Sequence, residues 1–328
     1  MRIVVATEAP QGACSFYRSL GVLPYLNRIK AGITIESIAQ IDWYIVSGAD
    51  IIFLERPSTR EYLAAAQTAK DLNIKLWCDF DDDFFNLPQD NPSYPHYFKQ
   101  ETQTYIKKIL KMSDVVTVAT NQLKTKYSQF TEKEKITVIP NAFNDYIYTL
   151  PDFPSVNRII NWRGSNTHRN DLRTIGDAFE RIVKKYPDWL LSFMGYNPWF
   201  ITEGITDKVK YTDPLPISVY NKFIKNMGPA IQIHPLVKNE FNLSKSNVAW
   251  IEGTYSGSVF VGPNMPEFNK PGIEQYDNPD EFVEKIIMFM SDSKKRDQNY
   301  KLSLEYIKDN LLLSEVNKKR MEIIDRIL

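Results

Sequence analysis

The stretch FNLSKSNVAWIEGTYSGSVFVGP, residues 241–263, decides how this chain folds and what it binds. It predicts a loop, a short helix over 246–256 that Gly257 ends, and a buried strand that begins at SVFV. A helix start with small polar residues and a lysine favours an anion, because its free N–H groups and its dipole both face the ligand. The residues at this predicted start are Ser244, Lys245, Ser246 and Asn247.

Glu252 follows within the same predicted helix, about a turn and a half further in. Its neighbours Val248, Ala249, Trp250 and Ile251 are apolar, so a carboxylate stands out here, although an exposed helix carboxylate is the common alternative. A carboxylate can hold a ribose through its hydroxyls. The anion site and the ribose site together suit a nucleotide diphosphate.

Composition favours an ordinary globular protein of two domains. The chain has 328 residues, of which 43% are hydrophobic, and its 40 basic residues balance its 40 acidic ones. This balance gives no support for sequence-independent nucleic-acid binding. Cys14 and Cys78 are too far apart for a metal or redox pair. With no signal pattern and no membrane-spanning apolar run, we expect a soluble, cytoplasmic protein.

Short apolar runs alternate with amphipathic helical stretches along the chain, which predicts an α/β fold. The pattern is lost over Pro140–Asn157 and then restarts, so we expect two Rossmann-like domains with doubly wound parallel sheets, over 1–150 and 151–313. One large doubly wound domain is the alternative. Ser314 predicts the N-cap of the last helix. The predicted strands are 2–6, 50–54, 75–78, 115–119 and 136–139, then 158–162, 190–194, 209–211, 230–233 and 258–261.

The loop NWRGSNTHRNDL, residues 161–172, follows a predicted strand and leads into a helix. Arg163 and Arg169 can each bind a phosphate, and Gly164 allows the backbone close to it. Ser165 lies in the same loop, and His168 can hydrogen-bond the same anion. An ordinary polar loop is the alternative. Its pairing with the 244–252 segment in one domain favours an anion site.

The run DFDDDFF, residues 79–85, follows the predicted strand KLWC and places four carboxylates together. Such a cluster needs a cation, arginines or hydrogen-bond donors, because the charges repel each other. Three interpretations stay open: a metal-binding Asp-x-Asp, a group that binds sugar hydroxyls or acts as general base, and an acidic helix N-terminus. The metal is the least expected of the three. The carboxylates are those of Asp79, Asp81, Asp82 and Asp83.

Other polar residues follow predicted strands and would reach the same edge of a sheet. Gly12 and Ser15 open the first predicted helix, and Arg18 lies one turn in. This start offers a second anion or acceptor contact, or is simply a capped helix. His234 follows the strand AIQI and can contact a ligand or another loop residue. The aromatic segment 196–200 can stack on a base or cover the domain edge.

Together, NWRGSNTHRNDL, the IHPL before NEFNLSKSNVAWIEG, and VIPNAFND at the crossover resemble the group 1 glycosyltransferases, most closely a phage and bacterial sub-type. The resemblance implies retaining, nucleotide-sugar-dependent enzymes of the GT-B architecture, with two Rossmann-like domains facing a cleft. Glu252 then matches the second glutamate of a paired-glutamate motif, which holds the ribose. Arg163 and Arg169 stand where the family neutralises the leaving diphosphate in place of a metal. The first domain, 1–150, would then bind the acceptor and the second, 151–313, the nucleotide-sugar donor. The last helix, 314–328, would pack back on the first domain.

The chain departs from the family pattern at identifiable positions. Ser244 stands eight positions before Glu252, where the family has its first glutamate. The glycine-rich turn after the first strand is reduced to Gly12, and the first-domain histidine has no clear match. These departures leave the donor sugar and catalytic competence open.

From the residues and the resemblance, we expect a retaining, metal-independent glycosyltransferase that uses a nucleotide-sugar donor, a UDP-sugar by family habit. No cofactor is expected beyond this co-substrate. One of Asp79, Asp81, Asp82 or Asp83 would orient or deprotonate the acceptor hydroxyl. The acceptor stays open between a glycan, a modified DNA base, a lipid and a protein, and the oligomeric state is open too. The alternatives are a sugar-nucleotide epimerase or hydrolase of the same fold and a non-catalytic nucleotide-binding scaffold.

Overall fold

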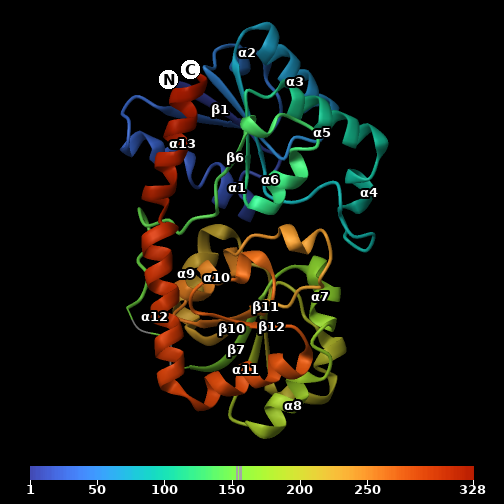
Figure 1. Ribbon diagram of the computed structural model, residues 1–328, viewed down its shortest axis with the longest axis vertical. Helices are drawn as coiled ribbons and strands as arrows, with labels where there is room; N and C mark the ends of the chain where they lie inside the picture. Colours follow the sequence, from blue (N-terminus) through green and yellow to red (C-terminus); the bar gives the residue numbers. More distant parts are fainter. Residues whose placement is uncertain (153, 155–156) are drawn as a thin grey trace. The chain divides into compact units, whose positions relative to one another are not determined.

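The computed structural model describes residues 1–152, 154 and 157–328, and divides the chain into two compact units. Each unit is built on one six-stranded sheet whose strands all run parallel (Figure 1), which confirms the predicted α/β class. Of the crossover predicted over 140–157, residues 153, 155 and 156 lie outside the described part. The first unit holds Met1–Tyr146, Ser244–Ser246 and Leu311–Leu328, and the second holds Ile147–Leu243 and Asn247–Asn310.

In the first unit the strand order is β2-β1-β3-β4-β5-β6. The order reverses at β1, which pairs with β2 on one side and β3 on the other. Such a switch point leaves a crevice at the carboxyl ends of the strands, where ligands bind in open parallel sheets. The strands are β1 Arg2–Ala6, β2 Thr34–Ile38, β3 Ile51–Glu55, β4 Lys75–Phe80, β5 Val115–Val118 and β6 Ile136–Val138.

Both faces of this sheet are covered. Alternate side chains of a strand point to opposite faces, so Val4 and Ala6 enter one apolar core while Ile3 and Val5 enter another. Burial on both faces explains why these strands are continuous apolar runs. The helices of the unit, with η marking a 3-10 helix, are α1 Ala13–Arg18, η1 Leu23–Arg28, α2 Trp43–Ser47, α3 Arg60–Asp71, α4 Tyr94–Tyr97, α5 Gln100–Met112, α6 Asn121–Tyr127, η2 Lys133–Lys135 and α13 Leu313–Ile327.

The second unit has strand order β12-β11-β10-β7-β8-β9, with its switch point between β7 and β10. Helix α8 packs on α11, and α10 packs on α9 and α12. Its strands are β7 Asn157–Arg163, β8 Leu190–Met194, β9 Val209–Thr212, β10 Pro229–Ile233, β11 Val259–Pro263 and β12 Ile273–Tyr276. Its helices are η3 Asn166–His168, α7 Arg169–Arg173, α8 Ala178–Lys185, η4 Trp199–Ile201, η5 Glu203–Lys208, α9 Ile217–Met227, η6 Asn242–Ser244, α10 Val248–Tyr255, η7 Pro266–Phe268, α11 Pro279–Ser291 and α12 Ser293–Asn310.

The last helix, α13, packs on the first unit, where Leu313, Val316 and Ile324 enter the same core as β1 (Figure 1). The prediction that Ser314 caps this helix is wrong, because α13 begins at Leu313 and Ser314 lies inside it. The capping oxygen comes instead from Asp145, whose carboxylate accepts the Ser314 N–H at 3.0 Å. A backbone bridge between Phe143 and Leu312 holds the two segments together and makes this cap possible.

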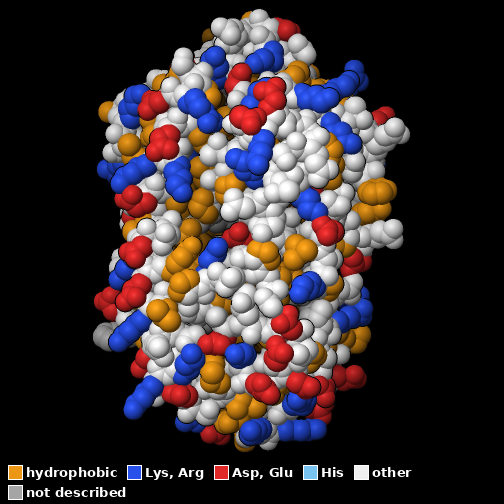
Figure 2. Space-filling model, in the orientation of Figure 1, with side chains coloured by type: hydrophobic (Ala, Val, Ile, Leu, Met, Phe, Trp, Pro, Cys, Tyr) orange, Lys and Arg blue, Asp and Glu red, His pale blue; other side chains and the backbone are white. Residues whose placement is uncertain are grey.

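Charges of both signs are mixed over the visible face of the molecule (Figure 2), in line with 40 basic and 40 acidic residues. Among the described residues, no helix combines the length and the apolarity that a membrane crossing requires.

Candidate active site

Arg163 ends β7, at the switch point of the second sheet. The residue is only 7% exposed, and its Nε, Nη1 and Nη2 atoms meet no hydrogen-bond partner among the described residues. The nearest opposite charge is the carboxylate of Glu252, with 3.8 Å between Nε and Oε2. A buried guanidinium has five donors to satisfy, and leaving them unpaired is costly. An anion bound here would satisfy these donors.

Glu252 lies on α10, whose other side chains are mostly buried apolar ones. Its carboxylate accepts a hydrogen bond of 2.6 Å from the Tyr220 hydroxyl on α9. Burial, and then the nearby Glu252 charge, raise the pKa of Tyr220 well above its usual value, so this hydroxyl stays protonated and donates. Tyr220 thus orients Glu252, whose other lone pairs can accept from ribose hydroxyls.

The turn after β7 brings two glycines together. A Cβ at Gly164 would lie 2.6 Å from the Trp162 ring, and a Cβ at Gly195, after β8, would lie 2.5 Å from the Gly164 carbonyl oxygen. Gly195 also has a φ of +90°, which side chains rarely adopt. A side chain at Gly164 would therefore collide with the Trp162 ring, so glycine fits this turn; close approach of a phosphate here stays a prediction.

His168 and His234 lie next to each other, with ring centroids 5.4 Å apart. His168 is fixed by Asp171, at 2.8 Å between Nδ1 and Oδ2. The other oxygen of Asp171 accepts from the Val237 N–H and the Asn242 side chain. Burial alone would raise the pKa of Asp171, but the hydrogen bond and charge of His168 bring it below its usual value. Two predicted residues, one in η3 after β7 and one directly after β10, are therefore brought together at the switch point.

Arg169 and Ser165 lie differently from Arg163. Arg169 is exposed, and its guanidinium lies 5.6 Å from the centroid of the Phe200 ring. Ser165 is exposed and caps η3, where its hydroxyl accepts from the Thr167 N–H. The predicted stacking residue Phe200 is thus covered by arginines in this structure, since Arg173 also lies over its ring.

The first unit holds a buried ion pair at the carboxyl end of β4. Arg18 donates to both oxygens of Asp79, at 2.9 and 2.7 Å, and the two residues are 1% and 2% exposed. Thr117 donates a further hydrogen bond to Asp79. Arg18 also donates to the Ile139 carbonyl oxygen and the Asn141 side chain. Arg18 thus meets an internal carboxylate; Gly12 is the N-cap residue of its helix.

The remaining carboxylates of the acidic run also have partners. Arg56 donates to both oxygens of Asp81, at 2.5 and 2.6 Å. Burial alone would raise the pKa of Asp81, but the charge and hydrogen bonds of Arg56 lower it to about 2. Asp82 lies 2.9 Å from the Lys245 ammonium. Asp83 accepts from the Phe85 N–H and the Asn86 amide. The chain itself neutralises or hydrogen-bonds this run.

Arg56 adopts an unusual backbone conformation at the end of β3. Its φ is +49°, in the left-handed region, which costs a non-glycine residue roughly 1–3 kcal/mol. Its N–H donates to the Asp79 carbonyl oxygen at 2.9 Å, which holds the turn in place. This backbone conformation places the guanidinium against Asp81.

The predicted start of the nucleotide helix is shifted. Helix α10 begins at Val248, not at residue 246, and Asn247 is its N-cap residue. The shift arises because Ser244–Ser246 belong to the first unit, where the Ser244 carbonyl accepts from Thr120 and the Ser246 hydroxyl accepts from Asn141. The Ser244 hydroxyl is buried and has no hydrogen-bond partner among the described residues.

Sequence reasoning missed two residues that shape the site. Tyr220 lies on a different helix from Glu252, 32 positions away, and no sequence signal links them. Asp171 stands three positions after His168, a spacing that places two side chains on one face of a helical turn. This spacing in the sequence could have identified Asp171 as a partner of His168.

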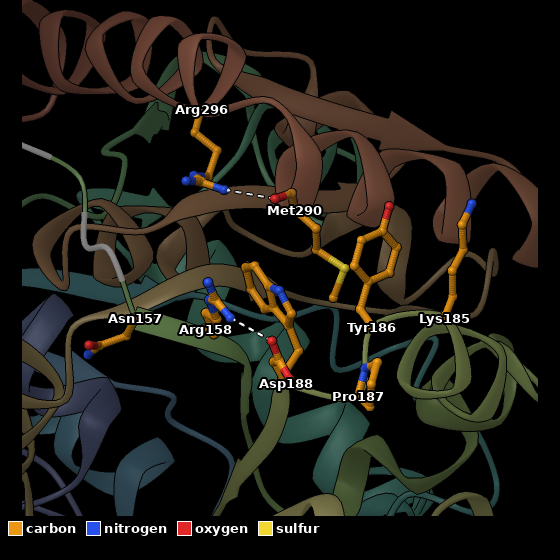
Figure 3. A pocket seen from close by; sticks show the side chains of 9 residues that line it. Asn157, Arg158, Lys185, Tyr186, Pro187, Asp188, Met290 and Arg296 are labelled. Carbon is orange, nitrogen blue, oxygen red and sulfur yellow. Dashed lines mark hydrogen bonds and ion pairs between the residues drawn. The ribbon is translucent and has the colours of Figure 1, made fainter.

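A pocket of about 510 Å³ in the second unit lies at the other end of the sheet (Figure 3). It is lined by Asn157 and Arg158, which begin β7. Arg158 pairs with Asp188 at 2.7 Å, Arg296 donates to the Met290 carbonyl oxygen, and the Lys185 ammonium lies 5.8 Å from the centroid of the Tyr186 ring. Ligands of open parallel sheets bind at the carboxyl ends, so this pocket is separate from the candidate site.

No family model matches the sequence, and no curated protein matches it. Solved structures do match. A glycosyltransferase from Rickettsia africae ESF-5 is 16% identical, with a TM-score of 0.69 over 99% of this chain and 98% of that one. HepE from Anabaena, in complex with UDP and glucose, is 12% identical, with a TM-score of 0.68 over 99% and 100%. Sucrose-phosphate synthase from Thermosynechococcus elongatus is 10% identical, with a TM-score of 0.69 over 100% and 99%. The two α/β units of this chain, each with a six-stranded parallel sheet, match these proteins over nearly their whole length. The chain therefore has the GT-B fold of glycosyltransferases.

Proposed function

We propose that this protein is a retaining glycosyltransferase that moves a sugar from a UDP-sugar to an acceptor hydroxyl without a metal ion. The second unit binds the donor, with Arg163 on the diphosphate and Glu252 on the ribose. Support comes from the fold and from HepE, a protein of the same fold solved with UDP-glucose.

The proposal rests mainly on the burial of Arg163 and on its lack of hydrogen-bond partners in the part of the chain that the structure describes. A guanidinium that is 7% exposed and lacks hydrogen-bond partners among the described residues is maintained at the switch point. Planar guanidinium groups bind phosphate through paired hydrogen bonds.

The reaction would proceed as follows. The bond between the anomeric carbon and the diphosphate oxygen breaks, and its electron pair stays on the diphosphate. The acceptor oxygen bonds the anomeric carbon on the same face, and the acceptor proton passes to a carboxylate. Arg163 stabilises the charge that builds on the leaving group, where a preorganised donor in a dry site has its largest effect.

Within the acidic run, the geometry favours Asp82 for the acceptor proton. Asp79 and Asp83 are 2% and 0% exposed and are held by internal partners. Asp81, with a pKa of about 2, is a weak base at neutral pH. Asp82 also pairs with Lys245 and Arg56, but its side chain is 19% exposed and can reach a hydroxyl group.

Metal independence is part of the proposal. Arg18, Arg56 and Lys245 pair with Asp79, Asp81 and Asp82, so a divalent cation would have to displace a basic side chain. Arg163 supplies positive charge for the diphosphate instead.

A product assay tests the proposal. The full chain is incubated with a panel of UDP- and GDP-sugars and with saccharide, DNA, lipid and peptide acceptors, with and without EDTA, and released nucleotide and the anomeric configuration of the glycoside product are followed by NMR. We expect release from a UDP-sugar, unchanged by EDTA, and a product with the donor's configuration. Nucleotide binding without release would support the scaffold alternative, and a modified sugar with donor alone would support the epimerase or hydrolase. Loss of activity with EDTA would make the acidic run a metal site.

A further inference from the structure

A second pocket, of about 600 Å³, lies in the first unit, away from the acidic run. It is lined by Glu8, which follows β1, by Gln40, which follows β2, and by the first turn of α3. These segments meet at the carboxyl ends of β1 and β2, beside the switch point of this sheet. Its volume is typical of small-ligand sites, which span about 300–1,000 Å³.

Part of the lining of this pocket is aromatic. Trp43, the first residue of α2, is 47% exposed and lines it, while Tyr62 of α3 lines it and is buried. The backbone that carries Trp43 is fixed, because Asp42 accepts from the N–H groups of Tyr44 and Ile45 at 2.9 and 3.2 Å. A half-exposed indole presents a flat face with negative charge density to the C–H groups of a sugar ring.

The polar lining suits hydroxyl groups. Glu8, Gln40, Thr59 and Glu61 supply carboxylate, amide and hydroxyl oxygens around the aromatic surface. A hydrogen bond from Thr59 lowers the pKa of Glu61, so its carboxylate is ionised and accepts hydrogen bonds at neutral pH. Two carboxylates against the single basic residue Arg60 leave the lining with an excess of negative charge, which disfavours phosphate-rich ligands.

We propose that this pocket binds a sugar ring of the acceptor, and that the acceptor is therefore a neutral saccharide rather than a nucleic acid. The aromatic face of Trp43 stacks on the ring, and Glu8, Gln40 and Glu61 accept from its hydroxyls. This inference rests on the proposed transferase function, and it decides among the acceptor classes that the sequence leaves open.

Tyr44 offers a matched control for Trp43. It is the next residue of α2, it is 90% exposed, and it does not line the pocket. The full-length wild type and the variants Trp43→Ala, Trp43→Phe, Tyr44→Ala and Glu61→Gln are titrated with a panel of neutral mono- and disaccharides and with a DNA duplex. Binding is followed by saturation-transfer NMR, and release of UDP from UDP-glucose is measured separately, with and without saccharide.

We expect at least one saccharide to bind the wild type and to bind about tenfold more weakly to Trp43→Ala and Glu61→Gln. Trp43→Phe should recover part of the affinity, and Tyr44→Ala should stay within about twofold of the wild type. Equal binding by Trp43→Ala and wild type, no saccharide binding, or binding of DNA alone would overturn the inference. Because saccharide binding is measured without donor, a failure here is distinct from failure of UDP release, which would contradict the proposed function instead.

Discussion

Arg163 and Glu252 form a buried pair that stops short of a hydrogen bond, with 3.8 Å between Nε and Oε2. The carboxylate is held by the Tyr220 hydroxyl instead, at 2.6 Å. The guanidinium donors therefore have no hydrogen-bond partner among the described residues, while the carboxylate is engaged by Tyr220. Unpaired buried polar groups cost stability, and such a cost is common where activity requires a preorganised site.

Replacing Glu252 by Ala should weaken donor binding. If its carboxylate accepts from ribose hydroxyls, the variant loses hydrogen bonds to a charged group, which contribute about 1.5–3 kcal/mol. This loss should raise KM for the donor about 10- to 150-fold. Because the ribose is remote from the reacting bond, kcat should change much less. Steady-state kinetics measure both, with Glu180→Ala on the exposed face of α8 as control. An unchanged KM would remove Glu252 from the donor site.

Replacing Tyr220 by Phe should have a smaller effect of the same kind. The variant removes only the hydroxyl that orients Glu252, so KM for the donor should rise less than in Glu252→Ala. The double variant should match Glu252→Ala alone, because residues of one hydrogen-bond network are not additive. Additive losses in donor titrations would show that Tyr220 acts separately from Glu252.

Replacing Arg18 by Met should strongly destabilise the first unit. Breaking a buried ion pair leaves Asp79 uncompensated and costs about 3–5 kcal/mol. The control is Arg2→Met, which removes a pair with Glu36 whose side chains are 33% and 41% exposed, and exposed pairs contribute at most about 1 kcal/mol. Urea unfolding measures both. Equal midpoints for the two variants would contradict the structural role given to Arg18.

Acid stability should depend on Asp81. Its pKa is about 2 in the folded protein against a usual 3.8, so the folded state binds fewer protons than the unfolded state between these values. Its contribution is complete above pH 3.8 and is lost as the pH falls towards 2. Thermal unfolding of Asp81→Asn should therefore vary less over this range than that of the wild type. The surface variant Asp188→Asn should follow the wild type, and parallel curves for Asp81→Asn would be the contrary result.

The central strands could be predicted because they are buried on both faces. β1 at Arg2–Ala6 and β8 at Leu190–Met194 match their predicted ranges. The edge strands β2 and β12 were missed, because TIESI and IEQY are only partly buried and carry polar residues. An edge strand with one open side does not need an apolar run.

The site could be predicted in its residue types but not in its pairings. Arg163, Gly164 and Glu252 follow strands or stand out on apolar helices, so their positions in the sequence single them out. Lys245 was expected beside the diphosphate, yet it pairs with Asp82, 163 positions away. Such contacts depend on tertiary packing, which local patterns do not encode. Retention, metal independence, a cytoplasmic location and the phage or bacterial sub-type stay predictions.

The central claim is tested most directly by Arg163→Met, with Arg158→Met as control on the same strand. Arg158 begins β7 with a side chain that is 65% exposed, so its loss should leave activity and stability unchanged. Transfer of sugar and release of UDP should fall about 100- to 1,000-fold in Arg163→Met, while the melting temperature without donor should fall less than in Arg18→Met, because Arg163 lies 3.8 Å from Glu252 and makes no hydrogen bond to the described residues. Full turnover in Arg163→Met, or a loss of activity explained by unfolding, would contradict the assignment of Arg163 to the leaving diphosphate.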